Sequence, residues 1–210
     1  MEINKKGIIF VISAPSGTGK TTLCERLLKI LPDLRMSVSH TTRKPRANEK
    51  DGVDYFFIDK EKFEQMIAND EFIEWAEVYG NFYGTSKKVI SDLVKGGYDI
   101  LLDIDTQGAR NIKKLYPDSV LIFILPPSLK ELERRLLLRN EDKEVISKRL
   151  SKASDEILQY KFYDYIVIND EIERTLNDLL CIIHAERLKT KRVQSEKIDE
   201  ILKNKEERQP

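Results

Sequence analysis

The chain begins with a pattern of apolar and polar positions that predicts a strand, a glycine-rich loop and a helix. Residues 7–13 (GIIFVIS) form a continuous apolar run, which is typical of a strand buried on both faces of a parallel sheet. The next segment repeats Leu23, Leu27 and Leu31 at helical spacing until Pro32 ends the helix. The three elements follow one another without interruption.

Three further apolar runs predict buried strands later in the chain, at residues 98–105, 119–125 and 163–170. The first two are each followed by a segment with helical periodicity, and the third leads into a helical pattern over residues 171–188. Strands that alternate with helices indicate an α/β fold, in which a central parallel sheet is flanked by helices.

Two segments interrupt this alternation, and the last residues differ from both. Residues 37–88 (the insert) are rich in Tyr, Phe and Thr with short strand-like runs, and they predict a small mixed or antiparallel β unit. Residues 128–158 (the arm) are helical in pattern and dense in Arg, Lys and Glu. We expect a charged tail at 191–210 to be a solvated or fraying helix, and a core made of 1–36, 89–127 and 159–190.

The composition is that of a folded soluble protein, with 40% hydrophobic and 34% charged residues in 210. Lys plus Arg and Asp plus Glu both number 36, so a bound anion must be held by a local cluster. We therefore expect no nucleic-acid partner. With neither a signal peptide nor a membrane span in the pattern, we expect no membrane partner and a cytoplasmic protein.

Cysteine and histidine are too scarce for a metal motif or a disulfide framework. The chain holds two of each, and they are far apart. Both Cys24 and Cys181 fall in apolar helical patterns, so we expect two buried thiols. We assign no role to His40.

The loop after the first strand, residues 13–22 (SAPSGTGKTT), resembles the phosphate-loop pattern G-x-x-x-x-G-K-[ST] with Ala14 at the first glycine. Its backbone N–H groups and the helix N-terminus favour a bound phosphate. Lys20, expected to face solvent, would reach the β- and γ-phosphates, and Thr21 would ligate Mg²⁺. A glycine turn without a ligand is the alternative, but the flanking strand and helix favour an ATP site. The predicted ATP-binding residues are Ala14, Pro15, Ser16, Gly17, Thr18, Gly19, Lys20, Thr21 and Thr22.

Two aspartates end the strand at 98–105. Asp103 and Asp105 are two residues apart, so they should point to the same face, at the carboxyl end of a parallel strand where ligands collect. One of them could hold Mg²⁺ directly or through water, and we assign Thr21 and Asp103 as metal ligands. Two solvent-facing acids are the alternative.

Five stretches together carry a resemblance to a known family. SAPSGTGKTT, SVSHTTRKPRANEKDGVDYFF, EFIEWAEVYGNFYGTS, LLDIDTQGA and ERRLLLRN…SKRLSKA resemble guanylate kinase, a P-loop nucleoside monophosphate kinase, from about Gly7 to Lys189. Alanine is a known alternative at position 14 of that loop. The resemblance implies a P-loop kinase fold with a β insert for the acceptor nucleotide and a helical lid. It also implies Mg²⁺-dependent transfer from ATP to GMP, with dGMP accepted as well, by a monomer or homodimer.

The insert would hold the acceptor. By pattern alone, Arg43 and Arg46 flank Pro45 as surface arginines, and Glu74 lies on a solvated strand face. The resemblance assigns the phosphate of GMP to residues matching Ser39, Arg43, Arg46, Tyr55 and Tyr83. It assigns the guanine to Glu74, Thr85 and Asp105, and we place Asp103 in the same GMP set.

The arm carries three further arginines of interest. Arg135 and Arg139 are four residues apart, hence on one helical face, and Arg149 follows on the next helix. Glu131 could simply pair with Arg135. By resemblance, the three arginines close over the transferring phosphate, so the predicted catalytic residues are Lys20, Arg135, Arg139 and Arg149.

Two other functions remain open. One is a guanylate-kinase-like module that binds phosphopeptides without catalysis, and the other is a related P-loop kinase with a different phosphate acceptor. The presence of Lys20, the loop glycines and the arm arginines favours an enzyme. Glu74 together with Thr85 argues for a guanine acceptor.

Overall fold

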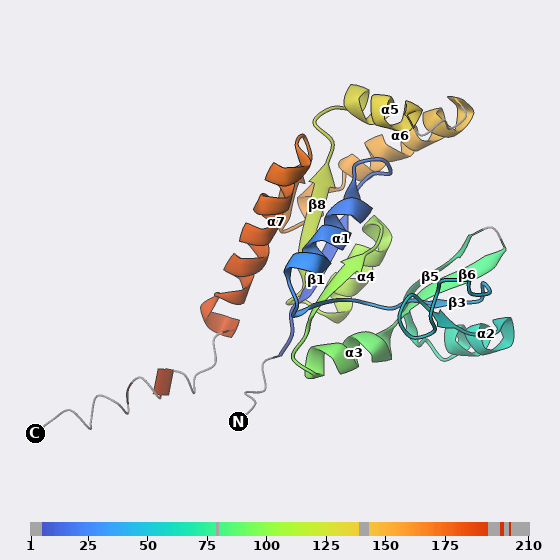
Figure 1. Ribbon diagram of the computed structural model, residues 1–210, viewed down its shortest axis with the longest axis vertical. Coiled ribbons are helices and arrows are strands. Elements are labelled where there is room, and N and C mark those ends of the chain that lie inside the picture. The colour runs from blue at the N-terminus through green and yellow to red at the C-terminus, as the bar shows by residue number, and fades with distance from the viewer. Residues whose placement is uncertain (1–5, 79, 139–142, 193–197, 200–201, 203–210) are drawn as a thin grey trace, which may run out of the picture.

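The computed structural model describes residues 6–78, 80–138, 143–192, 198–199 and 202. It places a parallel sheet with its helices at the centre, the arm beyond one end of this sheet, and the insert to one side (Figure 1). Lys6, near the start of the chain, and the 3₁₀ turn at Lys191 and Arg192 line one cavity.

The central sheet has five parallel strands in the order β2-β7-β1-β8-β9. Its strands are β1 (Ile9–Ser13), β2 (Leu34–Met36), β7 (Asp99–Asp103), β8 (Val120–Leu125) and β9 (Tyr165–Ile168). The predicted α/β fold with a parallel sheet is confirmed. We call the end of the sheet where the strands begin its amino edge, and the end where they finish its carboxyl edge.

Helices cover both faces of this sheet, as the alternation of buried residues in β1 requires. Phe10 and Ile12 pack against α1 (Lys20–Ile30) and α7 (Ile172–Arg187). Ile9 and Val11 belong to the opposite cluster, which includes side chains of α3 (Lys87–Lys95) and α4 (Thr106–Leu115). Because both faces are buried, the strands read as continuous apolar runs.

A second, smaller sheet lies within the insert and has the order β4-β3-β6-β5. The β3–β4 pair is parallel, whereas β3–β6 and β5–β6 are antiparallel. The strands of this sheet are β3 (His40–Thr41), β4 (Phe56–Phe57), β5 (Phe72–Val78) and β6 (Asn81–Ser86), and the helix α2 (Lys60–Ala68) lies between β4 and β5 in the sequence. Phe63, Met66 and Phe72 form a core of its own beneath this sheet.

The arm consists of α5 (Leu129–Leu137) and α6 (Lys143–Ile157), packed on each other through Leu132, Leu136, Ile146 and Ala153. Short 3₁₀ turns follow at η1 (Tyr160–Phe162) and η2 (Thr190–Arg192). Most of the predicted tail helix lies outside the described residues.

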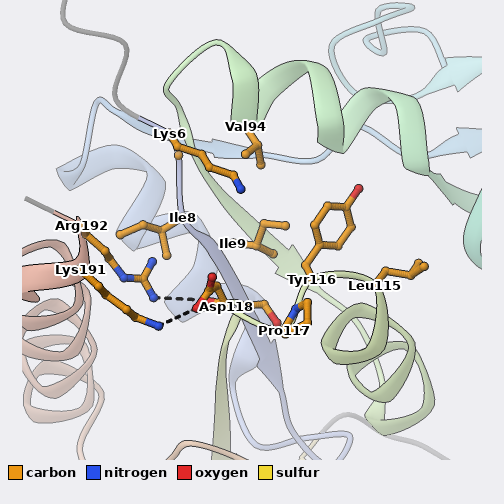
Figure 2. A pocket seen from close by; sticks show the side chains of 12 residues that line it. Lys6, Ile8, Ile9, Val94, Leu115, Tyr116, Pro117, Asp118, Lys191 and Arg192 are labelled. Atoms are coloured by element: carbon orange, nitrogen blue, oxygen red, sulfur yellow. Dashed lines mark hydrogen bonds and ion pairs between the residues drawn. The ribbon is translucent and has the colours of Figure 1, made fainter. Parts of the chain in front are cut away.

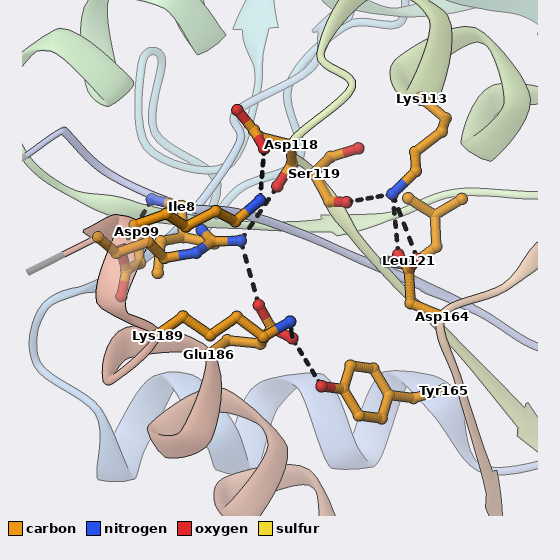
Figure 3. A network of polar contacts seen from close by, with 12 residues as sticks. Ile8, Asp99, Lys113, Asp118, Ser119, Leu121, Asp164, Tyr165, Glu186 and Lys189 are labelled. Atoms are coloured by element: carbon orange, nitrogen blue, oxygen red, sulfur yellow. Dashed lines mark hydrogen bonds and ion pairs between the residues drawn. The ribbon is translucent and has the colours of Figure 1, made fainter.

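A network of ion pairs holds the end of α7 against the amino edge (Figure 3). The carboxylate of Asp99 accepts hydrogen bonds from the backbone N–H of Ile8 at 2.9 Å and from Nε of Arg187 at 2.6 Å. Glu186 accepts from the Tyr165 hydroxyl and from the Lys189 ammonium, both at 2.6 Å. These contacts join residues up to 91 positions apart, so they fix the chain's tertiary arrangement.

The two cysteines differ in burial. Cys24 is buried in α1, and this burial raises the pKa of its thiol to about 12. Cys181 is exposed, so the prediction of two buried thiols is wrong for this residue. Its position explains the exposure, because Leu179 and Ile183 of α7 face the sheet and Cys181, two residues from each, points away.

Within the described part of the chain, no helix combines the length and the apolar character that crossing a membrane requires.

Candidate active site

The phosphate loop connects the carboxyl end of β1 to the first residue of α1. Gly17 and Gly19 have φ angles of 93° and 99°, which glycine adopts without strain, and this explains both glycines of the loop. The loop encloses a cavity of about 370 Å³. The cavity is lined by Ala14, Pro15, Ser16, Gly17, Gly19, Lys20, Thr21, Thr22, Asp103 and Glu156. Eight of the nine predicted ATP-binding residues therefore meet at one hollow, and Thr18 is buried beside them.

Lys20 lies at the start of α1, where its ammonium pairs with the carboxylate of Asp103 and donates to the Ile104 carbonyl at 3.4 Å. The expectation that Lys20 faces solvent is wrong, since only 20% of its side chain is exposed. The register of the sheet supplies the reason: Ile12 of β1 lies opposite Asp103 of β7. This pairing brings the aspartate next to the loop.

Asp105 occupies a different position from Asp103. β7 ends at Asp103, and Asp105 is the N-cap of α4, where its carboxylate accepts from the N–H of Gly108 at 2.8 Å. Asp105 lines a second cavity of about 320 Å³ that also includes Glu74, whereas Asp103 lines the loop cavity. The prediction that both carboxylates share one face is therefore wrong, because the strand ends before Asp105.

Glu74 and Thr85 face each other across the antiparallel pair β5–β6. The Thr85 hydroxyl donates to the Glu74 carboxylate at 2.5 Å. Burial raises the pKa of Glu74, the Thr85 hydrogen bond lowers it, and nearby Asp105 raises it further, with a net upward shift. The interpretation of Glu74 as a solvated strand residue is wrong, because the first turn of α4 covers this part of β5.

Arg43 is held in place by several groups of the insert. Its guanidinium donates to the Glu49 carboxylate and to the Lys44 carbonyl, each at 2.8 Å. The same guanidinium lies 5.5 Å from the centre of the Tyr55 ring, and the Tyr55 and Tyr83 rings are 5.9 Å apart. The structure thus brings Arg43, Tyr55 and Tyr83 together.

Glu49 connects the two predicted phosphate-binding arginines. One oxygen accepts from Arg43, and the other accepts from the backbone N–H of Arg46 at 2.8 Å. The hydrogen bond from Arg43 lowers the pKa of Glu49, and the same bond raises the pKa of Arg43. The side chain of Arg46 is exposed, and Ser39 contributes its carbonyl to a hydrogen bond from the Phe56 N–H at 2.9 Å.

The arm reaches the loop through two of its three predicted arginines. Arg135 donates to Glu131 at 2.8 Å, as the simple ion-pair alternative expected, and also to the Asn169 carbonyl at 3.0 Å. Arg149 donates to the hydroxyl of Ser16 at 2.8 Å. Arg139 lies outside the described residues.

Sequence reasoning missed Glu156 and Asn169 at this end of the sheet, and Glu49 in the insert. The amide of Asn169 donates to the Thr18 carbonyl at 2.6 Å and so holds the loop in place. Asn169 directly follows β9, so the carboxyl-end rule that singled out Asp103 also applied to it. Glu49 and Glu156 carried no comparable signal, because acidic residues in charged segments are usually solvated.

A cavity of about 250 Å³ lies at the opposite, amino edge (Figure 2). None of the predicted site residues lines it. Two of its cations contact Asp118, with the Lys191 ammonium 2.6 Å from the Asp118 carboxylate and Arg192 donating to the Asp118 carbonyl at 3.2 Å (Figure 2). The convergent polar groups of the predicted site are thus at the carboxyl edge and in the insert.

Comparison with known proteins identifies a matching family and several similar sequences. The sequence model of the family described as guanylate kinase matches residues 6–186. The chain is 52% identical to the guanylate kinase of Carboxydothermus hydrogenoformans over 189 residues, covering 90% of this chain and 93% of the relative. It is 54% identical to that of Nitrosospira multiformis over 185 residues, covering 88% of each chain.

A solved structure agrees with these sequence matches. The crystal structure of guanylate kinase from Anaplasma phagocytophilum superposes with a TM-score of 0.69 at 41% identity, covering 91% of this chain and 92% of that one. The family match spans most of the chain and the sequence identities reach about half of the aligned residues. The chain therefore belongs to the guanylate kinase family.

Proposed function

We propose that this protein is an ATP:GMP phosphotransferase, which transfers the γ-phosphoryl group of ATP to GMP and yields ADP and GDP. Relatives that bear the name guanylate kinase at about half identity support this activity. We further propose that dGMP is accepted, that residues 37–88 form the acceptor-binding unit, and that residues 128–158 act as a lid.

One observation carries the proposal. Both cavities reach the segment at the end of β7, where Asp103 lines the loop cavity and Asp105 lines the second cavity. Only Ile104 separates the two aspartates, and its carbonyl accepts a hydrogen bond from Lys20. Two adjacent polar hollows suit a reaction in which a phosphoryl group passes directly from a donor nucleotide to an acceptor.

On the donor side, the loop N–H groups and the start of α1 would bind the phosphates of ATP. Lys20 would exchange the carboxylate of Asp103 for phosphate oxygens, which is possible because both side chains are about one-fifth exposed. The Thr21 hydroxyl and the Asp103 carboxylate are oxygen donors of the kind Mg²⁺ prefers, and both line the cavity. Together with phosphate oxygens they would hold Mg²⁺, which supplies charge neutralisation on the transferring group.

On the acceptor side, Glu74 would bind guanine through the adjacent N1–H and N2 amine, which are two donors matching one carboxylate. Thr85 already orients that carboxylate. We propose that Ser39, Arg43, Arg46, Tyr55 and Tyr83 bind the phosphate of GMP, with Asp103 and Asp105 completing the site. Arginine is suited to this task because its planar fork binds phosphate through two hydrogen bonds.

The arm would neutralise charge on the phosphoryl group during transfer. Arg135 and Arg149 already touch the loop through Thr18 and Ser16. We propose that Arg139 acts with them, as the family resemblance implies. Closure of the arm would also exclude water, which otherwise competes with GMP as the acceptor.

An acceptor screen tests the proposal. ADP formation from ATP and Mg²⁺ would be measured with GMP, dGMP, AMP, CMP, UMP and dTMP in separate reactions. We expect turnover with GMP and dGMP, and selectivity against AMP of about ten-thousand-fold, because adenine presents an acceptor at N1 where guanine presents a donor to the Glu74 carboxylate.

The other two functions give different results in the same screen. Turnover with a pyrimidine nucleotide in place of GMP would identify a related kinase with another acceptor. Binding of a phosphoserine peptide at micromolar concentration, without turnover of any nucleotide, would identify a non-catalytic module. Either result would contradict the proposed function.

A further inference from the structure

Helix α6 of the arm turns one face toward the phosphate loop. Arg149, Ala153 and Glu156 are spaced by four and three residues, so they share this face. Arg149 donates to Ser16 of the loop at 2.8 Å, Ala153 is buried, and Glu156 lines the loop cavity. The carboxylate of Glu156 therefore reaches the donor site from the arm, two helical turns beyond the arginine.

Two of the charged side chains that line this cavity are carboxylates, whereas the Arg149 cation binds Ser16 at its rim. Among the described residues, the lining contains the cation Lys20 and the two carboxylates of Asp103 and Glu156. The Lys152 ammonium lies 3.6 Å from Glu156, but its side chain is 73% exposed and solvent screens the pair. Burial raises the pKa of Glu156, and the opposing effect of Lys152 does not offset this shift.

This arrangement matters for the form in which a nucleotide binds. A metal-free polyphosphate brings several negative charges toward Glu156 and Asp103, and the like charges repel. A nucleotide that carries Mg²⁺ brings a cation into the same space, and the repulsion is reduced or reversed. The loop N–H groups and Lys20, in contrast, attract both forms.

We propose that Glu156 is a specificity-determining residue of the donor site, one that makes the site select the magnesium complex of the nucleotide over the free nucleotide. The inference rests on the proposed function, since it requires ATP and ADP to bind at the loop. It also gives the arm a second role beside its arginines.

The test measures binding rather than turnover. Calorimetry would give the dissociation constant of ADP in the presence of Mg²⁺ and in the presence of a chelator, and the ratio of the two is the readout. We expect wild type to prefer the magnesium complex, and Glu156→Gln to reduce this preference by about tenfold, because one nearby charge contributes on that order. Most of the change should come from tighter binding of free ADP.

Matched variants separate charge from structure. Asp155→Asn removes the same charge from the neighbouring exposed position and should keep the wild-type ratio. Glu156→Asp keeps the charge and should keep most of the preference. Lys152→Gln removes the exposed cation beside Glu156 and should increase the preference by about twofold, since surface pairs are weak. This last variant leaves the buried surface of α6 untouched.

The outcomes distinguish a failure of the Glu156 inference from a failure of the proposed kinase function. Wild type that phosphorylates GMP and binds ADP, together with an unchanged ratio in Glu156→Gln and Lys152→Gln, would overturn the inference alone. Wild type that binds ADP in neither form would overturn both the inference and the proposed function. A reduced ratio in Glu156→Gln that Asp155→Asn reproduces would also overturn the inference, because the effect would then be one of net charge.

Discussion

The two edges of the central sheet both carry ion pairs, but the two fully buried acids of the described residues, Asp99 and Glu186, are both at the amino edge. At the amino edge, the side chains of Asp99 and Glu186 are 1% and 2% exposed. At the carboxyl edge, the side chains of Asp103 and Glu131 are 21% and 24% exposed. Both edges place lysine and arginine against carboxylates, so the presence of charged clusters alone does not distinguish a binding site from a structural contact.

The two edges differ in whether a carboxylate can release its hydrogen-bond partner to another group. A buried acid such as Asp99 satisfies its oxygens with a backbone N–H and an arginine, and loss of either partner leaves a charge without water. A partly exposed acid such as Asp103 borders a cavity, and it can release Lys20 to a phosphate at little cost. The amino edge is therefore built for stability, and the carboxyl edge for exchange of partners.

The largest effect that this comparison predicts is on turnover in Lys20→Ala. The change removes the cation of the loop, so phosphoryl transfer should fall by about a thousandfold, in the range seen when a positioned charge-stabilising group is lost. The fold should persist, because Asp103 keeps contact with water. Steady-state kinetics with ATP and GMP would measure the loss.

The control for this variant is a lysine at the other edge. Lys113 pairs with Asp164 at 3.0 Å near the beginning of β8 and β9. Lys113→Ala should leave turnover close to that of wild type. If both variants lost activity equally, or if Lys20→Ala stayed active, the two edges would not differ as argued.

The second prediction concerns the free energy of unfolding instead of turnover. Asp99→Asn removes the partner of Arg187 inside the amino-edge network, and it should lower the free energy of unfolding by about 3 kcal/mol, as expected when one member of a buried pair is lost. GMP turnover at 25 °C should be unchanged, because no predicted site residue is near. Urea unfolding followed by circular dichroism would measure the change.

Asp118→Asn is the matched control for Asp99→Asn. Asp118 also belongs to the amino edge, but its side chain is 83% exposed and its Lys191 partner is 57% exposed. Its loss should hardly move the unfolding midpoint. A large destabilisation by Asp118→Asn would show that burial of the acid is not the deciding variable.

The same comparison explains which features the sequence could predict. The central sheet followed from its continuous apolar strands, and the loop followed from glycines whose positive φ values are now visible. The resemblance pointed to Glu74 and Thr85, whereas pattern alone placed Glu74 in solvent. Its burial depends on the approach of α4 to β5, a contact between residues far apart in sequence.

The remaining errors have the same origin in tertiary contacts. The Lys20–Asp103 pair depends on the register between β1 and β7, which no local pattern encodes. The separation of Asp103 from Asp105 depends on where β7 ends, and strand ends are poorly marked in sequence. Glu49 could not be anticipated as the partner of Arg43, because the charged loop that contains it reads as solvated.

The third prediction concerns the acceptor. Glu74→Gln keeps one oxygen but turns the other into a donor that faces guanine's own donors, so GMP binding should weaken by about 1–3 kcal/mol. ATP binding should be unaffected, and selectivity against AMP should narrow. Kinetics with GMP and AMP would test these expectations.

The control is Glu77→Gln, at an exposed position of the same strand, which should keep wild-type selectivity. Equal selectivity in Glu74→Gln would assign guanine recognition to another residue.

The smallest predicted effect is a change in acid stability at the amino edge. Burial alone would raise the pKa of Glu186, but hydrogen bonds from Lys189 and Tyr165 outweigh it and hold the pKa below its ordinary value of about 4.5. Because the folded state binds this proton less readily than the unfolded state, the stability from Glu186 is present above pH 4.5 and is lost as the pH falls through the folded pKa.

Glu186→Gln cannot titrate, so its unfolding midpoint should start lower at pH 7 and decline less steeply below pH 4.5. Urea unfolding at a series of pH values would compare the two slopes, with Glu133→Gln, at an exposed position of the arm, as the control. Parallel slopes for wild type and Glu186→Gln would mean that the amino-edge network does not depend on this carboxylate's charge, and that its stability comes from packing around Asp99.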